Sequence, residues 1–175
     1  MILGTWRVAF AAVGILALLG AVDAGAASAP RKFKDWSLYE HQDDNGKTCF
    51  ITTVAIKQEG AKNEREAPRL FVTRFPVPSP NEQVMVDPGY RYKPDTGASL
   101  GIDKKSFDLL VKDDKAWGKS PADDEALVQA MKRGNQAIAR GTSTIGTTPA
   151  DTYSLVGFSA AYEALDKACS NAGRR

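Results

Sequence analysis

The chain has 175 residues, of which 43% are hydrophobic and 25% charged, and 23 basic against 21 acidic side chains give a formal net charge of +2. These proportions are those of an ordinary globular domain, and they exclude a disordered chain, a collagen-like fibre and a polytopic membrane protein. The balanced charge argues against nucleic-acid binding, which needs a concentrated basic face. With two Cys and one His the chain has too few ligands for a zinc site, and it carries no nucleotide- or cofactor-binding motif.

The first 26 residues have the pattern of a secretory signal peptide. Arg7 precedes Val8–Val22, an uncharged run that is short for a membrane-spanning helix. Small residues follow, and we expect cleavage after Ala26, because cleavage after Ala29 would leave a proline as the next residue. An uncleaved N-terminal anchor is the alternative. Residues 27–175 then form one mature domain without a membrane span, in the periplasm or secreted to the outer surface.

The mature chain begins with patterns typical of β-strands. Residues 34–41 alternate, residues 48–56 are rich in β-branched and aromatic side chains, and the Asn45-Gly46 pair between them indicates a hairpin. Both faces of the second strand are apolar, which predicts a central place in a sheet. After a polar segment over 57–68, read as a solvated loop, the pattern predicts a series of strands at 70–75, 83–86, 90–93, 100–102 and 106–111.

Two helices are predicted towards the C-terminus. Ser120 and Pro121 suit the N-cap and the first turn of a helix over 121–133, which Gly134 ends. Strand character returns at 135–144 and 151–156, and the final helix covers 159–169. About eight short strands with frequent turns favour a mainly β protein, a single antiparallel β-sandwich or barrel-like domain with two short helices towards the C-terminus.

The two cysteines lie in different elements. Cys49 is in the most strand-like segment, and Cys169 shares a face of the last helix with Tyr162 and Leu165. Disulfides persist in exported proteins, so we expect one internal bridge between them. Two free thiols, or bridges between chains, are the alternatives.

The sequence offers little catalytic chemistry. His41 is the only imidazole, and Asp43 or Asp44 could orient it as the general base of a small hydrolase, although a solvated turn residue is the simpler interpretation. No nucleophile elbow is present. We therefore expect no catalytic residues, metal or cofactor.

Aromatic and cationic side chains suggest a different kind of site. Tyr90, Arg91, Tyr92 and Trp117 form a tentative interaction patch, because such residues often anchor protein interfaces. The alternative is that the rings cover the end of the sheet or pack inward.

Several separated motifs resemble, in order, the invasion-associated locus B family. They cover about residues 34–170 and comprise Asp35–Tyr39, Lys47–Ile51, Phe71–Arg74, Gly89–Lys93, Lys115–Trp117, Ala130–Gly134 and Asp151–Ala161, ending at Cys169. One departure is Phe75, where the resemblance leads us to expect a second arginine after Arg74. This weakens any argument that a basic pair binds a partner there.

The resemblance implies an exported alphaproteobacterial protein with no known catalytic residues. We therefore expect a non-enzymatic protein of the periplasm or envelope that binds an unknown protein or host-surface partner and contributes to host-cell interaction or invasion. Two alternatives remain: a periplasmic carrier of a small apolar ligand inside a closed barrel, and the small hydrolase that uses His41.

Overall fold

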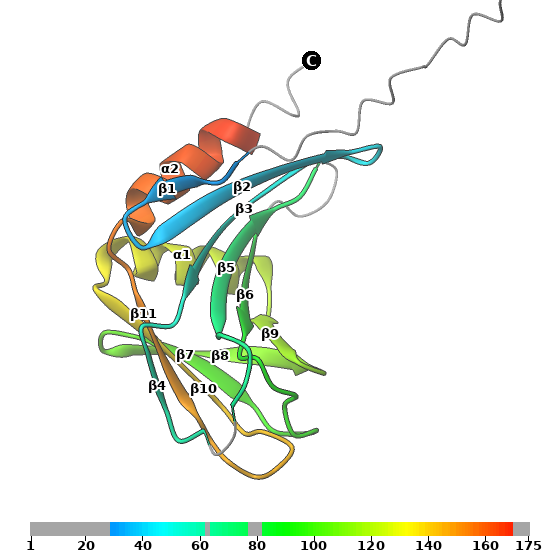
Figure 1. The fold of residues 1–175 in the computed structure, drawn as a ribbon, viewed down its shortest axis with the longest axis vertical. Helices are drawn as coiled ribbons and strands as arrows, with labels where there is room; N and C mark the ends of the chain where they lie inside the picture. The colour runs from blue at the N-terminus through cyan, green and yellow to red at the C-terminus, as the bar shows by residue number, and fades with distance from the viewer. Residues whose placement is uncertain (1–28, 62–63, 77–81, 170–175) are drawn as a thin grey trace, which may run out of the picture.

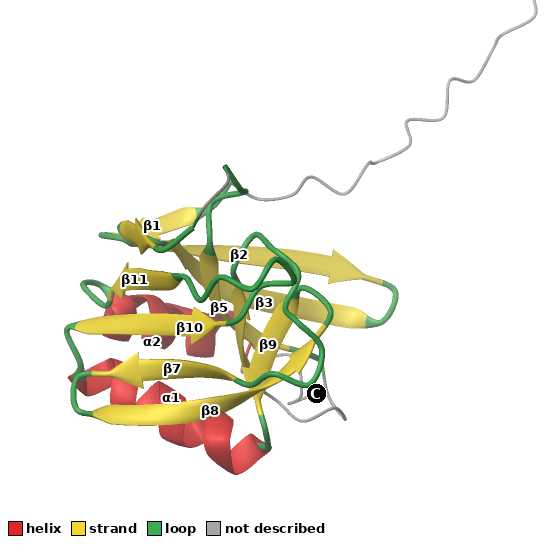
Figure 2. Ribbon diagram, turned by 90° about the horizontal axis from the view of Figure 1, so that it is seen from below, coloured by secondary structure: helices red, strands yellow, loops and turns green. Residues whose placement is uncertain are grey.

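The computed structural model describes residues 29–61, 64–76 and 82–169, so the predicted signal peptide over 1–26 lies outside the described residues. The described chain forms one curled antiparallel sheet, and two helices cover the side of it that carries the buried side chains (Figures 1 and 2). In chain order the elements are β1 Arg31–Phe33, β2 Trp36–Asp43, β3 Gly46–Val54, β4 Lys57–Glu59, β5 Arg69–Arg74, β6 Gln83–Asp87, β7 Ala98–Ile102, β8 Lys105–Lys112, β9 Lys115–Gly118, α1 Pro121–Arg133, β10 Gln136–Gly141, β11 Ala150–Ser154 and α2 Phe158–Cys169.

The strand order is β1-β2-β3-β5-β6-β9-β8-β7-β10-β11-β4, and all recorded pairs are antiparallel. The expectation of a mainly β, barrel-like domain with two helices is confirmed, and the sheet curls into a half-barrel instead of dividing into the two layers of a sandwich. The ends of the curl approach each other, since Trp36 Nε1 at the start of β2 donates to the Ser154 carbonyl at the end of β11, 3.1 Å away.

Most of the predicted elements are present, with differences where segments are short. The first hairpin is confirmed as β2 and β3, although its two-residue turn is Asp44-Asn45 and Gly46 begins the next strand. The prediction of a loop over 57–68 is wrong in part, because β4 pairs with β11. The prediction of a strand over 90–93 is also wrong, because Tyr92 makes only an isolated bridge to Ser143. The three- and four-residue strands β1 and β9 were not predicted, because so few residues show no periodicity.

Side chains fill the inner side of the half-barrel. Trp36, Tyr153 and Phe158 are the largest fully buried side chains, and the rings of Trp36 and Phe158 meet edge to face at 4.9 Å. Aliphatic residues of the central strands, among them Leu70 and Val84, have no exposed surface. At roughly 1.5–3 kcal/mol for each fully buried large side chain, this core accounts for most of the driving force for folding.

Helix α2 is attached to the sheet by a disulfide and by a polar cluster. Cys49 and Cys169 form the expected internal bridge, with 6.0 Å between their Cα atoms and 120 residues between them in sequence. Two turns earlier, the Tyr162 hydroxyl donates to Glu82 at 2.7 Å and accepts from Arg74 at 2.8 Å. Arg74 also contacts the Asp166 carboxylate. Arg74 of the family-like motif therefore binds side chains of the same molecule, and these contacts attach α2 to the sheet.

Candidate functional site

His41 lies on an open part of the surface. Its side chain is 65% exposed near the end of β2, and its Nε2 lies 3.8 Å from Asp43 Oδ2, beyond hydrogen-bond distance. It lines none of three pockets on the described part of the chain, which have volumes of about 210, 630 and 360 Å³. None of these three pockets therefore offers a substrate cleft beside the only imidazole.

Three members of the predicted interaction patch are at the surface, and the fourth is not. Arg91 is exposed, and Tyr90 and Trp117 are half-buried. Tyr92 is only 4% exposed and packs in the core, with its ring edge to face against Tyr90 at 5.2 Å. Tyr92 is therefore removed from the patch, because its ring packs inward.

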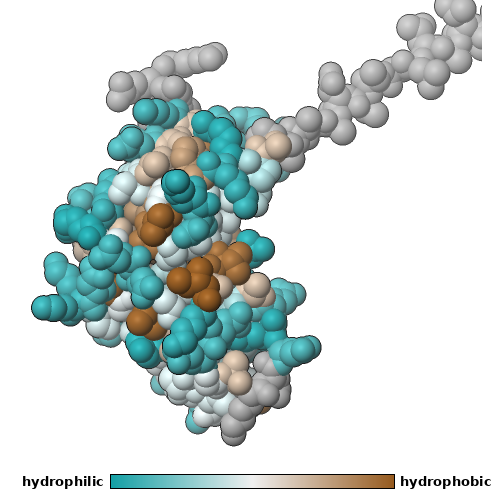
Figure 3. Space-filling view, turned by 60° about the vertical axis from the view of Figure 1, so that its left-hand side comes forward, coloured by the Kyte–Doolittle hydropathy of each residue, from teal (hydrophilic) through white to brown (hydrophobic). Residues whose placement is uncertain are grey.

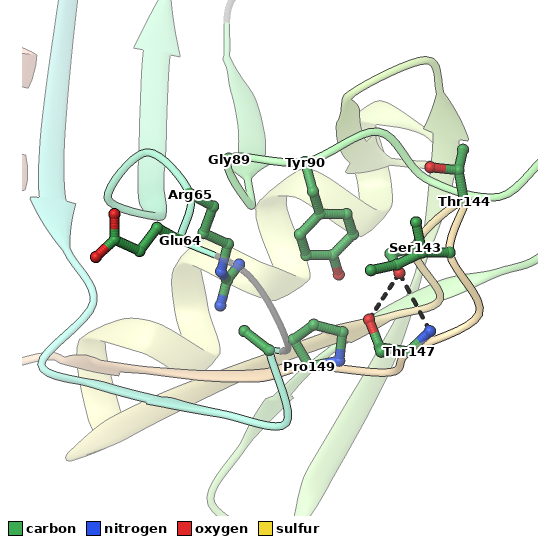
Figure 4. A pocket seen from close by; sticks show the side chains of 10 residues that line it. Glu64, Arg65, Gly89, Tyr90, Ser143, Thr144, Thr147 and Pro149 are labelled. Carbon is green, nitrogen blue, oxygen red and sulfur yellow. Dashed lines mark hydrogen bonds between the residues drawn. The ribbon is translucent and has the colours of Figure 1, made fainter.

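Tyr90 lines a pocket of about 210 Å³ at the loop end of the half-barrel (Figure 4), here called the Tyr90 pocket. Its wall opposite Tyr90 is the loop after β10, where Ser143 and Thr147 bond through their hydroxyls at 2.7 Å. Ile145 at the tip of this loop is 59% exposed. The lining residues are Ala61, Glu64, Arg65, Gly89, Tyr90, Ser143, Thr144, Ile145, Thr147 and Pro149.

Arg91 lines a larger pocket of about 630 Å³, here called the Arg91 pocket. One wall is the end of β8, where Leu110 is 57% exposed, and the other is the loop over 93–97. The lining residues are Arg91, Tyr92, Pro94, Asp95, Thr96, Gly97, Leu109, Leu110, Val111, Asp113, Lys119 and Thr144.

The two pockets and the sheet form a continuous surface. Thr144 lines both pockets, and Leu110 lies directly opposite Trp117 across the β8–β9 pair. Met85 lies opposite Trp117 on β6 and extends the apolar surface towards the middle of the sheet. The surface from Tyr90 through Arg91 and Leu110 to Trp117 is the candidate functional site, and it joins the three members of the predicted patch that reach the surface.

Sequence reasoning missed Leu110 and Ile145, because an isolated apolar residue in a strand or loop gives no sign of being exposed. Within the described residues, the large apolar side chains that are exposed are Val54, Ile56, Phe75, Leu110, Ile145 and Val156. On the face drawn in Figure 3, hydrophobic side chains form small separate groups among hydrophilic ones. Scattered apolar residues of this kind are normal on soluble proteins. Leu110 and Ile145 differ from them because each lines a pocket.

A buried ion pair between Arg65 and Asp151 supports the loops that line the Tyr90 pocket. The Arg65 and Asp151 side chains are 7% and 2% exposed, and Arg65 Nη1 donates to Asp151 Oδ2 at 3.0 Å while Nη2 donates to Oδ1. Arg65 Nη1 also donates to the Pro88 carbonyl, and the guanidinium lies 5.2 Å from the centre of the Tyr90 ring. The Tyr90 hydroxyl donates to the Gly141 carbonyl at 2.8 Å. These contacts connect the segments that carry Arg65, Tyr90 and Gly141.

Burial is the main cause of the pKa shifts around the Arg65–Asp151 pair. It raises the pKa of Asp151, an effect that the Arg65 guanidinium opposes. Burial, with a smaller contribution from the Asp151 charge, raises the pKa of Tyr90 to about 12. The pKa values of Tyr92 and Tyr153 are raised for the same reasons, so all three phenols stay protonated at neutral pH.

Within 29–61, 64–76 and 82–169, no three His, Cys, Asp or Glu side chains gather closely enough to hold a metal ion. Over the same ranges, no helix is long and apolar enough to cross a membrane.

Comparison with known proteins identifies a family and a similar solved structure. The family model described as "Invasion associated locus B (IalB) protein" matches residues 36–166. The crystal structure of invasion associated protein B from Bartonella henselae superimposes with a TM-score of 0.57 and 16% sequence identity, over 80% of this chain and 97% of that chain. At this identity the structural match shows a shared fold. No curated protein matches the sequence.

Proposed function

This chain belongs to the invasion associated locus B family, and from this premise we propose that it is an exported, non-catalytic protein of the bacterial envelope that binds a macromolecular partner. Export is supported by the signal-peptide pattern of residues 1–26. A protein–protein role is supported by the surface that joins Tyr90, Arg91, Leu110 and Trp117.

The proposal rests on one observation: each of the two pockets has an exposed apolar side chain in its lining, and a buried ion pair holds the neighbouring loops in place. Interfaces typically use aromatic, arginine and aliphatic anchors that enter pockets. Leu110 and Ile145 are each more than half exposed beside a pocket, and the Arg65–Asp151 pair holds the neighbouring loops. Such side chains contact water in the isolated protein, and their burial by a partner lowers the free energy of the complex.

The two other functions have weaker support. A hydrolase that uses His41 lacks a cleft, since this side chain is 65% exposed and lines none of the three pockets. A carrier needs an empty chamber for an apolar ligand, whereas Trp36, Leu70, Tyr153 and Phe158 fill the inner side of the half-barrel. A binding protein requires neither a cleft beside His41 nor an empty chamber.

The source of the partner is either the bacterium's own envelope or a host surface. The name of the Bartonella henselae protein associates that protein with invasion. For this chain we propose an interaction role, and both sources are tested in the same experiment.

The test is affinity capture by the exported protein from envelope extracts and, separately, from host-cell membranes. Leu110→Asp combined with Ile145→Asp should abolish capture, because both changes place a charge beside an apolar pocket wall. Val156→Asp is the matched control, since Val156 is 56% exposed and lines neither pocket. Failure to capture a reproducible partner from either source, or equal capture by all three proteins, would contradict the proposal.

A further inference from the structure

The Arg65 guanidinium keeps two N–H donors that bond to nothing within the described residues. A guanidinium carries five N–H groups in one rigid plane. Nη1 donates to the Asp151 carboxylate and to the Pro88 carbonyl, and Nη2 donates to the second oxygen of Asp151. The Nε–H is buried and has no hydrogen-bond partner. The second N–H of Nη2 lies along the same edge of the plane as the Nε–H, and these two donors are here called the free edge of Arg65.

The free edge is the part of the guanidinium that is left to face the Tyr90 pocket. Arg65 lines this pocket, whereas Asp151 and Pro88, which take the other donors, do not. Figure 4 shows Arg65 and Tyr90 on opposite sides of the pocket, with Pro149 below them. The Arg65 side chain is only 7% exposed, and buried donors normally have a partner. A group that enters the pocket can therefore bind by supplying an acceptor oxygen.

The other polar groups around the pocket are already paired or turned away. The Ser143 and Thr147 hydroxyls bond to each other at 2.7 Å, and the Tyr90 hydroxyl donates to the Gly141 carbonyl at 2.8 Å. Figure 4 shows the exposed Glu64 carboxylate directed away from Arg65 and Tyr90. A sugar would leave most of its hydroxyls without partners here, which opposes binding. The pocket therefore suits a group with one acceptor and an otherwise apolar surface.

The charges favour a neutral acceptor over an anion. The Asp151 carboxylate already neutralises the Arg65 guanidinium. A second anion at the free edge would lie close to the Asp151 carboxylate, which is 2% exposed and poorly screened from it by water. A neutral carbonyl oxygen avoids this repulsion, and its two lone pairs can accept both donors of the free edge.

The size and the apolar walls of the pocket suit one aliphatic side chain. The walls include the Tyr90 ring, the buried Pro149 and Ile145, which is 59% exposed. The volume of about 210 Å³ is below the roughly 300–1,000 Å³ of pockets that hold drug-sized ligands. In a polypeptide, the main-chain carbonyl is attached to the carbon that carries the side chain. A single aliphatic residue therefore supplies both the acceptor and the apolar group.

We propose that the Tyr90 pocket binds one aliphatic residue of a protein partner. The main-chain carbonyl of that residue accepts from the free edge of Arg65, and its side chain packs against Tyr90 and Ile145. This inference rests on the proposed function and names the partner chemistry at one part of the same site.

The test uses three small probes: acetyl-leucine methylamide, acetyl-glycine methylamide and acetyl-leucine with a free carboxylate. The exported protein, labelled with ¹⁵N, is titrated while the Arg65 Nε–H signal and the amide signals of 143–147 are followed by NMR. The leucine amide should shift both sets saturably, with a dissociation constant on the order of 1 mM for so small a ligand. The glycine amide should bind about tenfold more weakly, because it lacks the side chain. The free carboxylate should also bind more weakly than the leucine amide.

Ile145 and Val156 supply matched variants that leave the buried ion pair untouched. Ile145→Ala should weaken binding of the leucine amide about three- to tenfold, since it removes part of the apolar wall. Val156→Ala should bind like the wild type, because Val156 is 56% exposed and does not line the pocket.

The proposal is overturned if the leucine amide gives no saturable shift, or if the Arg65 Nε–H signal stays unchanged while the loop signals move. Equal binding of the glycine amide, tighter binding of the carboxylate, or unchanged binding by Ile145→Ala would also overturn it. Capture of a protein partner without binding of the leucine amide would reject this inference and leave the proposed function standing. Binding of the leucine amide without capture of any partner would support the pocket chemistry and reject the proposed function.

Discussion

The buried Arg65–Asp151 pair can be tested by replacing one residue at a time, because the two single variants should differ in how their unfolding free energy depends on pH. Replacing Asp151 with leucine leaves a guanidinium that is 7% exposed and cannot lose its proton. Breaking a buried pair in this way costs about 3–5 kcal/mol of unfolding free energy. This cost should stay nearly constant from pH 7 to pH 5.

Replacing Arg65 with methionine leaves a carboxylate that is 2% exposed, and this group can escape by taking up a proton. Burial already raises the pKa of Asp151, and removing the opposing Arg65 raises it further. A native state that holds a proton the unfolded state lacks loses stability as pH rises above the unfolded pKa of about 3.9. The cost at pH 7 is therefore at most about 4 kcal/mol, and it should shrink by up to about 1.4 kcal/mol for each pH unit lowered.

The measurement is urea unfolding of both single variants and the double variant at pH 5, 6 and 7. Arg65→Met with Asp151→Leu should be much more stable than the sum of the single changes predicts, because neither charge is left buried. Arg31→Met is the control: Arg31 is 54% exposed in its pair with Glu40, so the change should cost about 0–1 kcal/mol. Parallel pH profiles for the two single variants, or additive costs in the double variant, would refute the reasoning.

Four further outcomes are expected. Replacing both Cys49 and Cys169 with alanine should cost about 2–5 kcal/mol and lower the melting temperature while the circular dichroism spectrum stays the same; an unchanged melting temperature would contradict a stabilising bridge. Because burial and the nearby Glu82 carboxylate raise the pKa of Tyr162 to about 12, stability should fall between pH 10 and pH 12, and Tyr162→Phe should flatten this fall in thermal melts. His41→Ala should change stability by less than about 0.5 kcal/mol and leave partner capture intact; loss of capture would give this histidine a role. Intact-mass measurement should find a mature N-terminus at or near Ala27, and a membrane-bound form that retains residues 1–26 would favour the anchor.

Local patterns were sufficient for the elements whose signals lie within a few residues. Helix α1 begins as its sequence predicts, with the Asp123 N–H donating to Ser120 Oγ at 3.2 Å and Pro121 in the first turn. The first hairpin was found from alternation and turn residues, and the strands that form β7 and β8 were found from alternation. The disulfide partners followed from compartment and number, since two cysteines permit one internal pairing.

The candidate site depended on contacts between distant residues. Arg65 and Asp151 are 86 residues apart in sequence, and the pairs β6–β9, β7–β10 and β4–β11 join segments that are not consecutive. Tyr90 and Tyr92 show the consequence, because two positions in one motif have the same residue type and different burial. Their burial is decided by which loops close over them.

The sequence by itself determined the signal-peptide pattern, the strand-rich class, the two helices and the family. The first three depend on composition or on periodicity along a short stretch of chain, and the family depends on the resemblance of several motifs in order. Only the tertiary structure decided that Tyr92 is buried, that Leu110 is exposed beside a pocket, and that the loop over 93–97 forms the other wall of this pocket where the β7–β8 pairing ends. The physical reason is that a pocket forms where paired strands separate, and strand pairing in a curled sheet is set by packing across the whole core.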